Sequence, residues 1–112
     1  MAEIHWRQDW QAALAEAKKA NLPLLLELYL DGCPHCARLA NETLSDPAVV
    51  KAINERFIPI RLEGRGHMDL VRQFQVTGAP TTLLFSAQGE EIHRVTGFSP
   101  AAEYLQELAK AG

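Results

Sequence analysis

The sequence has 112 residues, of which 47% are hydrophobic and 22% are charged, the proportions of a soluble globular protein with one core. The net charge is −3, and the eleven lysine and arginine residues are scattered without forming a run, which argues against a nucleic-acid partner. We therefore predict one monomeric domain over residues 1–112.

Neither a leader nor a membrane segment is expected in this chain. Residues 1–7 lack both the basic start and the apolar run of a signal peptide. The longest apolar stretch, residues 22–30, is broken by Pro23 and Glu27 and is too short to cross a bilayer. The sequence as written predicts a cytoplasmic protein, or a periplasmic or otherwise exported one if a leader was removed.

The first predicted elements are a helix and a strand. Asp9 is predicted to cap a helix that ends near Asn21, ahead of Pro23. Residues 24–30 follow as an almost continuous apolar run, which is typical of a central strand covered on both faces. The packing residues predicted for the helix are Trp6, Trp10, Ala13, Leu14 and Ala17.

Two cysteines directly follow this strand. Cys33 and Cys36 are the only cysteines in the chain, so neither has another thiol as a partner. Residues three apart lie on nearly the same face of a helix, and Pro34 is tolerated in a first turn because its missing N–H would be unpaired there. We predict a helix that opens at Cys33 and continues through Leu44.

The rest of the chain alternates strands and helices and contains no repeat or linker. This order predicts an α/β fold with a central mixed sheet flanked by helices, in which the first two strands are parallel. The predicted elements are a helix capped by Ser45-Asp46-Pro47, a strand at 57–62, a loop at 63–66, a short helix at 70–74, hairpin strands at 83–85 and 92–95, and a last helix capped by Ser99-Pro100 with Leu105 and Leu108 inward.

The spacing of the cysteines indicates disulfide chemistry, in which the thiolate is the nucleophile. A free cysteine has a pKa of about 8.5, and a helix N-terminus or a cationic neighbour lowers it to roughly 3.5–7.5. Cys33 is predicted to lie at such an N-terminus, and His35 adds a donor or a positive charge in the same turn. Because this environment stabilises the reduced form, the pair should oxidise substrates more readily than a neutral one.

Other uses of the two cysteines find less support in the sequence. A structural zinc ion needs about four ligands, and His5, His67 and His93 show no matching spacing. A c-type haem would need histidine immediately after Cys36, where Ala37 stands. We therefore predict a redox pair that uses no metal and no cofactor.

Glu27 interrupts the predicted central strand. It shares one strand face with Leu25 and Tyr29, although a carboxylate that points to solvent from an edge strand is the alternative. An acid buried there without a partner would be costly and would have a raised pKa, which is typical of a proton-transfer group. We predict that Glu27 transfers protons.

The order of the elements, with Cys33-Pro34-His35-Cys36 and a Gly-Ala-Pro-Thr segment at residues 78–81, resembles the thioredoxin-like superfamily over essentially the whole chain. Residues 26–29, 44–47, 79–81 and 94–98 are similar to the C-terminal thioredoxin-like domains of transmembrane thiol-disulfide interchange proteins. The dipeptide Pro34-His35 is instead similar to the active-site loop of Dsb-type disulfide oxidases. The four segments and the Pro34-His35 dipeptide therefore suggest different directions of electron transfer between the protein and its substrates.

This resemblance implies roles for the residues that match its motifs. Cys33 matches the attacking, more exposed thiol and Cys36 the buried resolving thiol. Glu27 falls at the position of the buried acid that assists proton transfer to and from the resolving cysteine. Pro80 matches the cis-proline beside the cysteines, where the backbone of Ala79 would pair with an extended substrate segment.

One position departs from the family pattern. The family usually places tryptophan immediately before the first cysteine, and Gly32 occupies that position here. The substrate site is therefore expected to lack an aromatic rim.

Together these features predict a thiol-disulfide oxidoreductase whose partners are protein thiols and disulfides and an upstream redox protein. The direction of electron flow is left open. A non-catalytic thioredoxin-fold module that binds client proteins or a metal is the alternative from another class. A peroxidase-like or glutathione-linked enzyme is a third.

Overall fold

The computed structural model describes residues 3–111, in which helices alternate with strands as the sequence predicts. The elements are α1 (Trp10–Ala20), β1 (Leu24–Tyr29), α2 (Pro34–Arg38), the π-helical turn η1 (Leu39–Thr43), α3 (Pro47–Arg56), β2 (Ile58–Glu63), the 3-10 turn η2 (Gly64–Gly66), α4 (Met68–Gln73), β3 (Thr81–Phe85), β4 (Glu91–Thr96) and α5 (Ala101–Ala109).

The strands form one mixed sheet in the order β2-β1-β3-β4. β1 is parallel to β2 and antiparallel to β3, and β3 and β4 form the terminal hairpin. β1 is therefore an inner strand, and its first five residues are buried. The predicted mixed sheet and the parallel pairing of the first two strands are confirmed.

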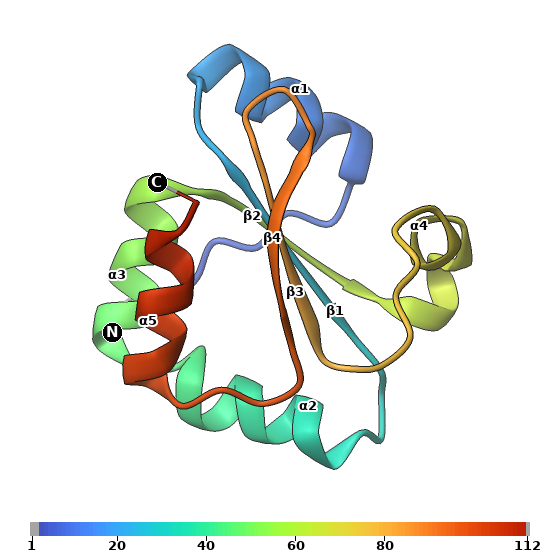
Figure 1. The fold of residues 1–112 in the computed structure, drawn as a ribbon, viewed down its shortest axis with the longest axis vertical. Helices are drawn as coiled ribbons and strands as arrows, with labels where there is room; N and C mark the ends of the chain where they lie inside the picture. The colour runs from blue at the N-terminus through green and yellow to red at the C-terminus, as the bar shows by residue number, and fades with distance from the viewer. Residues whose placement is uncertain (1–2, 112) are drawn as a thin grey trace.

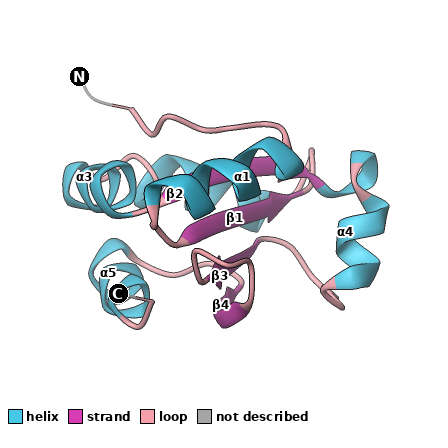
Figure 2. Cartoon of the chain, turned by 90° about the horizontal axis from the view of Figure 1, so that it is seen from above, coloured by secondary structure: helices cyan, strands magenta, loops and turns pink. Residues whose placement is uncertain are grey.

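Apolar side chains cover both sides of the sheet. On one side, α1 and α4 pack against alternate residues of β1, and the rings of Trp10, Phe74 and Phe85 lie 5.0 to 5.6 Å apart between centroids. On the other side, α3 and α5 enclose a second cluster that includes Leu25 and Tyr104. Figure 1 shows α3 and α5 side by side, with α4 on the opposite side of the sheet, and Figure 2 shows the same layers from above.

The predicted helix caps are confirmed at the first and third helices. The Asp9 carboxylate accepts the N–H of Ala12 at 2.9 Å, and Asn21 ends α1 in the left-handed conformation with φ 54°. The Asp46 carboxylate accepts two N–H groups at the start of α3, where Pro47 is the first helical residue. These caps are local, so the residue types alone predict them.

Three predictions about the helices need correction. The helix that follows Cys33 is not one continuous α-helix, because a π-helical turn replaces its second half from Leu39 to Thr43. Ser99 does not cap α5, since its side chain accepts no N–H group and its carbonyl instead accepts the Thr43 hydroxyl at 2.5 Å. Trp6 is not part of α1, because it precedes the helix and packs against the second cluster.

Two smaller differences concern the loop at 63–66 and the inward face of the last helix. The predicted loop contains a 3-10 turn, which the Glu63 carboxylate caps by accepting the N–H of Arg65. In α5 the fully buried residues are Tyr104 and Leu108, whereas Leu105 is only partly buried. The burial of this tyrosine was not predicted.

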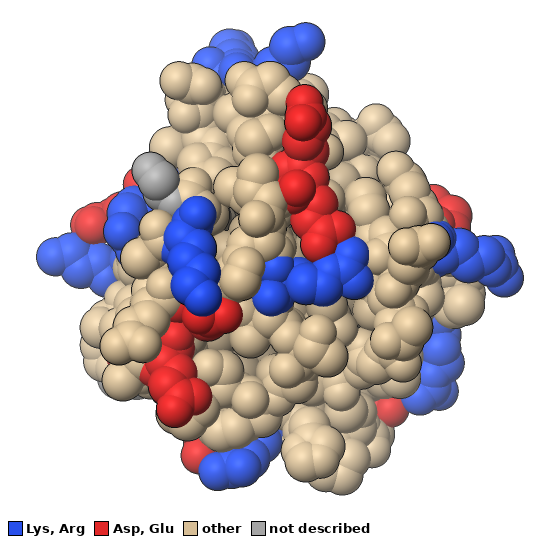
Figure 3. All heavy atoms as spheres, in the orientation of Figure 1, with Lys and Arg blue, Asp and Glu red and all other residues tan. Residues whose placement is uncertain are grey.

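Charged side chains of both signs lie near one another on the surface. Figure 3 shows basic and acidic side chains interspersed on the face that it draws. Ion pairs such as Arg94–Glu91 and Lys110–Glu107 join neighbours of opposite sign. Within residues 3–111, no helix is long and apolar enough to cross a membrane.

Candidate active site

The two cysteines lie where the inner strand β1 passes into α2, at the end of the sheet that Figure 1 shows next to α2. Gly32 makes the turn with a positive φ of 78°, a conformation that side-chain-bearing residues rarely adopt. Apart from its two chain neighbours, no described residue has an atom within 4 Å of a Cβ atom placed at Gly32. The positive φ of the turn therefore explains the glycine at position 32. A lack of space for a side chain does not explain it.

Cys33 is the N-cap of α2, and Pro34 is its first helical residue. The Cys33 sulfur accepts the backbone N–H of Cys36 at 3.3 Å, so one of the free donors at this helix end points at it. Cys33 is partly exposed, and Pro34 and His35 are exposed beside it. The structure thus places the helix N-terminus at Cys33 as the sequence predicts.

Cys36 differs from Cys33 in its surroundings. Its exposed fraction is 2%, and both thiols are free. Burial raises the pKa of Cys36 to about 11, and its hydrogen bond with Cys33 and the nearby charges of Cys33 and Glu27 act in the same direction. At neutral pH this thiol is protonated, so a base must deprotonate it before it can attack a disulfide.

The segment before β3 faces the exposed sulfur. The Ala79–Pro80 peptide bond is cis, and the Cys33 thiol donates to the Ala79 carbonyl oxygen at 3.7 Å. The structure therefore brings Ala79 and Pro80 to Cys33 across 46 residues of sequence.

Glu27 lies in β1 with none of its surface exposed. Its register partners are Arg61 in β2 and Thr82 in β3, and its Oε1 accepts the Thr82 hydroxyl at 3.1 Å. Its Oε2 is buried and has no hydrogen-bond partner among the described residues. Burial raises the pKa of Glu27 to about 8, although the charge of Arg61 and the bond from Thr82 oppose the rise. The buried acid with a raised pKa that the strand pattern predicts is present, and one of its two oxygens accepts the Thr82 hydroxyl.

Arg61 is a charged neighbour that the sequence reasoning missed. Its guanidinium lies 3.8 Å from the centre of the Tyr29 ring, and its Nε is buried with no hydrogen-bond partner within residues 3–111. It borders a cavity of about 270 Å³ that also reaches Cys33 and Cys36. The sequence predicts that the first two strands are parallel neighbours, and this was the available signal for Arg61. It does not predict the strand register, and the register is what places Arg61 opposite Glu27.

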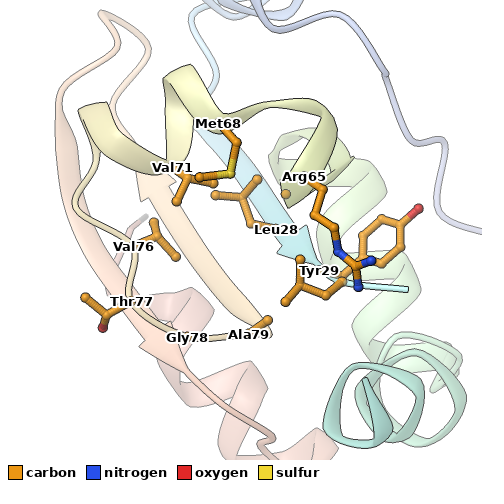
Figure 4. Close-up of a pocket in the computed structure, with 11 residues that line it drawn as sticks. Leu28, Tyr29, Arg65, Met68, Val71, Val76, Thr77, Gly78 and Ala79 are labelled. Atoms are coloured by element: carbon orange, nitrogen blue, oxygen red, sulfur yellow. The ribbon is translucent and has the colours of Figure 1, made fainter. Parts of the chain in front are cut away.

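An apolar pocket of about 290 Å³ is lined in part by the segment that ends at Ala79. Figure 4 shows the residues of the loop before Pro80 on one side of it, with Arg65 and Tyr29 opposite. The pocket adjoins Ala79, so a segment that pairs with the Ala79 backbone would pass its rim. Its lining residues are Leu28, Tyr29, Leu30, Gly64, Arg65, Met68, Val71, Val76, Thr77, Gly78 and Ala79.

Within the part of the chain that the structure describes, no three histidine, cysteine, aspartate or glutamate side chains gather in the manner of a metal site. The side chains at the site that can exchange electrons or protons are the two thiols and the buried carboxyl group.

A mixed sheet whose inner strand leads into a Cys-x-x-Cys helix, with a cis-proline beside the first sulfur, defines a thioredoxin-fold domain with a cysteine pair. The family model described as a thioredoxin-like domain matches residues 10–112, and the chain belongs to this family. The fold and family suggested by the sequence are confirmed.

Known proteins similar to this chain support the same relationship. It is 38% identical over 103 residues to the thiol:disulfide interchange protein DsbD of Yersinia pestis, covering 88% of this chain and 17% of the relative. The reduced C-terminal domain of Neisseria meningitidis DsbD is 26% identical with a TM-score of 0.76, covering 91% of this chain and 93% of that one. A thioredoxin from Thermus thermophilus is 28% identical with a TM-score of 0.85, covering 100% and 92%. The chain thus spans less than a fifth of the curated relative and corresponds to its C-terminal domain type.

Proposed function

We propose that this protein is a thiol-disulfide oxidoreductase that exchanges disulfides with protein substrates through Cys33 and Cys36. The observation that carries the proposal is the pairing of a partly exposed Cys33 with a buried Cys36 beside a buried carboxyl group. One sulfur is thereby accessible to a large partner, and the other is reserved for the intramolecular step. An upstream redox protein would return the pair to its starting state.

In the reducing direction, the Cys33 thiolate attacks a substrate disulfide, and one substrate sulfur leaves as a thiolate. A mixed disulfide now joins Cys33 to the other substrate sulfur. Glu27 takes the proton of Cys36, whose thiolate attacks the Cys33 sulfur and releases the second substrate thiolate. Two electrons have moved from the protein to the substrate, and a Cys33–Cys36 disulfide remains; the reverse sequence oxidises the substrate.

Equilibration of the protein in glutathione buffers of graded potential, followed by alkylation and mass spectrometry, tests the proposal. We expect a single two-electron transition in which both thiols disappear together. The oxidised protein should take up no alkyl group and should be two hydrogens lighter than the unalkylated reduced protein. A potential near −270 mV would indicate a thioredoxin-like reductase, and one near −120 mV a donor of disulfides. Failure of Cys33 and Cys36 to form a disulfide at any buffer potential would overturn it.

His35 is proposed to raise the potential of the pair, because a hydrogen-bond donor or a positive charge in the first turn of α2 stabilises the reduced, thiolate form. The change His35→Ala should therefore lower the reduction potential by up to roughly 60 mV, as measured in the same glutathione buffers. The matched control is His5→Ala, which removes an exposed histidine near Asn54 of α3 and should leave the potential unchanged. Equal potentials for His35→Ala and the unmodified protein would contradict the tuning role.

A further inference from the structure

A chain of three buried polar groups crosses the otherwise apolar second cluster. The Thr82 hydroxyl lies 3.1 Å from Oε1 of Glu27 and 2.9 Å from the hydroxyl of Tyr104. Thr82 is 1% exposed, and Tyr104 and Glu27 are not exposed at all. The three residues come from β3, α5 and β1, so only the tertiary structure brings them together.

The direction of these hydrogen bonds follows from the number of protons available. Thr82 has a single hydroxyl proton, which it donates to the Glu27 carboxylate. Its oxygen must then accept the proton of Tyr104, and burial raises the pKa of Tyr104, so the phenol stays a donor. Donation therefore runs one way, from Tyr104 through Thr82 to Oε1.

This arrangement makes the two oxygens of Glu27 unequal. Oε1 is engaged by Thr82, whereas Oε2 is buried with no hydrogen-bond partner among the described residues. The charge of Glu27 acts on the Cys36 thiol, so the carboxyl group and the resolving cysteine are electrostatic neighbours. Oε2 is the oxygen left free to bind and release a proton.

We propose that Thr82 and Tyr104 are positioning residues that hold Oε1 of Glu27, so that Oε2 is the oxygen that exchanges a proton with Cys36. This inference rests on the proposed function of the site. The two residues do not form a proton path to water, because Tyr104 is fully buried in the second cluster. They act through Glu27 by orienting its carboxyl group and by stabilising its ionised form.

The hydroxyl groups of Thr82 and Tyr104 are not explained by packing alone. Valine and phenylalanine would occupy nearly the same volumes as threonine and tyrosine without any polar group. A hydroxyl inside an apolar cluster contributes little to stability even when it is hydrogen-bonded, and it is costly when it is not. The hydroxyl groups therefore point to a role at Glu27 beyond the filling of space.

The test compares Thr82→Val with Thr82→Ser, which keeps the hydroxyl, and with Tyr104→Phe. The Glu27 titration is followed by NMR of its side-chain carboxyl carbon, and resolution of a preformed mixed disulfide on Cys33 is timed across pH. In Thr82→Val we expect the midpoint of the Glu27 titration and the midpoint of the pH–rate profile each to rise by about one pH unit. The rate at which the mixed disulfide is resolved at pH 7 should fall about tenfold. Thr82→Ser should restore both, and Tyr104→Phe should move both less, in the same direction.

The proposal is overturned if Thr82→Val leaves the Glu27 titration and the pH profile in place, or if Thr82→Ser behaves like Thr82→Val. A change in stability alone would indicate a packing role. The NMR titration also separates this inference from the proposed function. If Cys33 and Cys36 form no disulfide at any buffer potential, the proposed function fails, while the titration still decides whether Thr82 and Tyr104 act on Glu27.

Discussion

Replacing Cys36 with serine should trap a covalent complex between Cys33 and its substrate protein. The partly exposed Cys33 can still attack, but the buried thiol that would release the substrate is gone. The intramolecular step is then replaced by attack of an external thiol, and because a well-placed group has a very large effective concentration, turnover should fall by roughly 10³-fold or more. Insulin reduction measures the turnover, and non-reducing electrophoresis detects the complex.

The matched control for this variant is Cys33→Ser. It removes the attacking sulfur and keeps the buried one, so it should lose turnover without accumulating a complex. Two results would contradict the assigned roles: a complex with Cys33→Ser and none with Cys36→Ser, or full activity of either variant.

The change Glu27→Gln should slow the release of substrate by about 10²-fold at pH 7, the typical contribution of a general base. Glutamine fills nearly the same volume but cannot take the Cys36 proton. Since the pKa of Glu27 is raised to about 8, the rate of this step in the unmodified protein should increase with pH up to that value. The variant should lose this dependence, which stopped-flow measurement of mixed-disulfide decay can follow.

Glu103→Gln is the matched control, because Glu103 is exposed on α5 and undergoes the same chemical change. It should leave the rate and its pH profile unaltered. A pH profile that persists in Glu27→Gln would assign proton transfer to another group.

The same carboxyl group should also make folding stability depend on pH. The pKa of Glu27 rises from an ordinary 4.5 to about 8 on folding, so the folded protein holds the proton more tightly than the unfolded chain. Its contribution to stability is fully present below pH 4.5 and is lost as the pH rises toward 8, by roughly 4 to 5 kcal/mol in all. Urea titrations at several pH values should show this loss in the unmodified protein relative to Glu27→Gln, and parallel curves would contradict it.

The fold was predictable because its signals are local. The apolar run in β1, the caps Asp9 and Asp46 and the Cys-x-x-Cys spacing each depend on residues within a few positions of one another. The π-helical turn was not predicted, because one additional residue in a single turn scarcely changes the spacing of the apolar residues along the helix. The role of Ser99 was misjudged because its carbonyl bonds Thr43, which is 56 residues away.

Some residues of the candidate site could be predicted from the sequence, and others could not. Cys33, Cys36 and Glu27 stand out in the sequence, since two cysteines three apart and an acid among leucines are unusual wherever they occur. Arg61, Thr82 and Tyr104 are ordinary residues in ordinary strands and a helix. Their contacts with the site come from strand register and helix packing, which the sequence pattern does not specify.

The sequence by itself determined which chemistry this protein can perform, because local structure presents two thiols at a helix N-terminus behind an apolar strand. The tertiary structure decided how that chemistry is controlled. Burial raised the pKa of Glu27 and of Cys36, and contacts across 55 and 22 residues connected Glu27 to Thr82 and Thr82 to Tyr104. Desolvation and hydrogen-bond geometry depend on atoms that only folding assembles, so no stretch of the chain could reveal them alone.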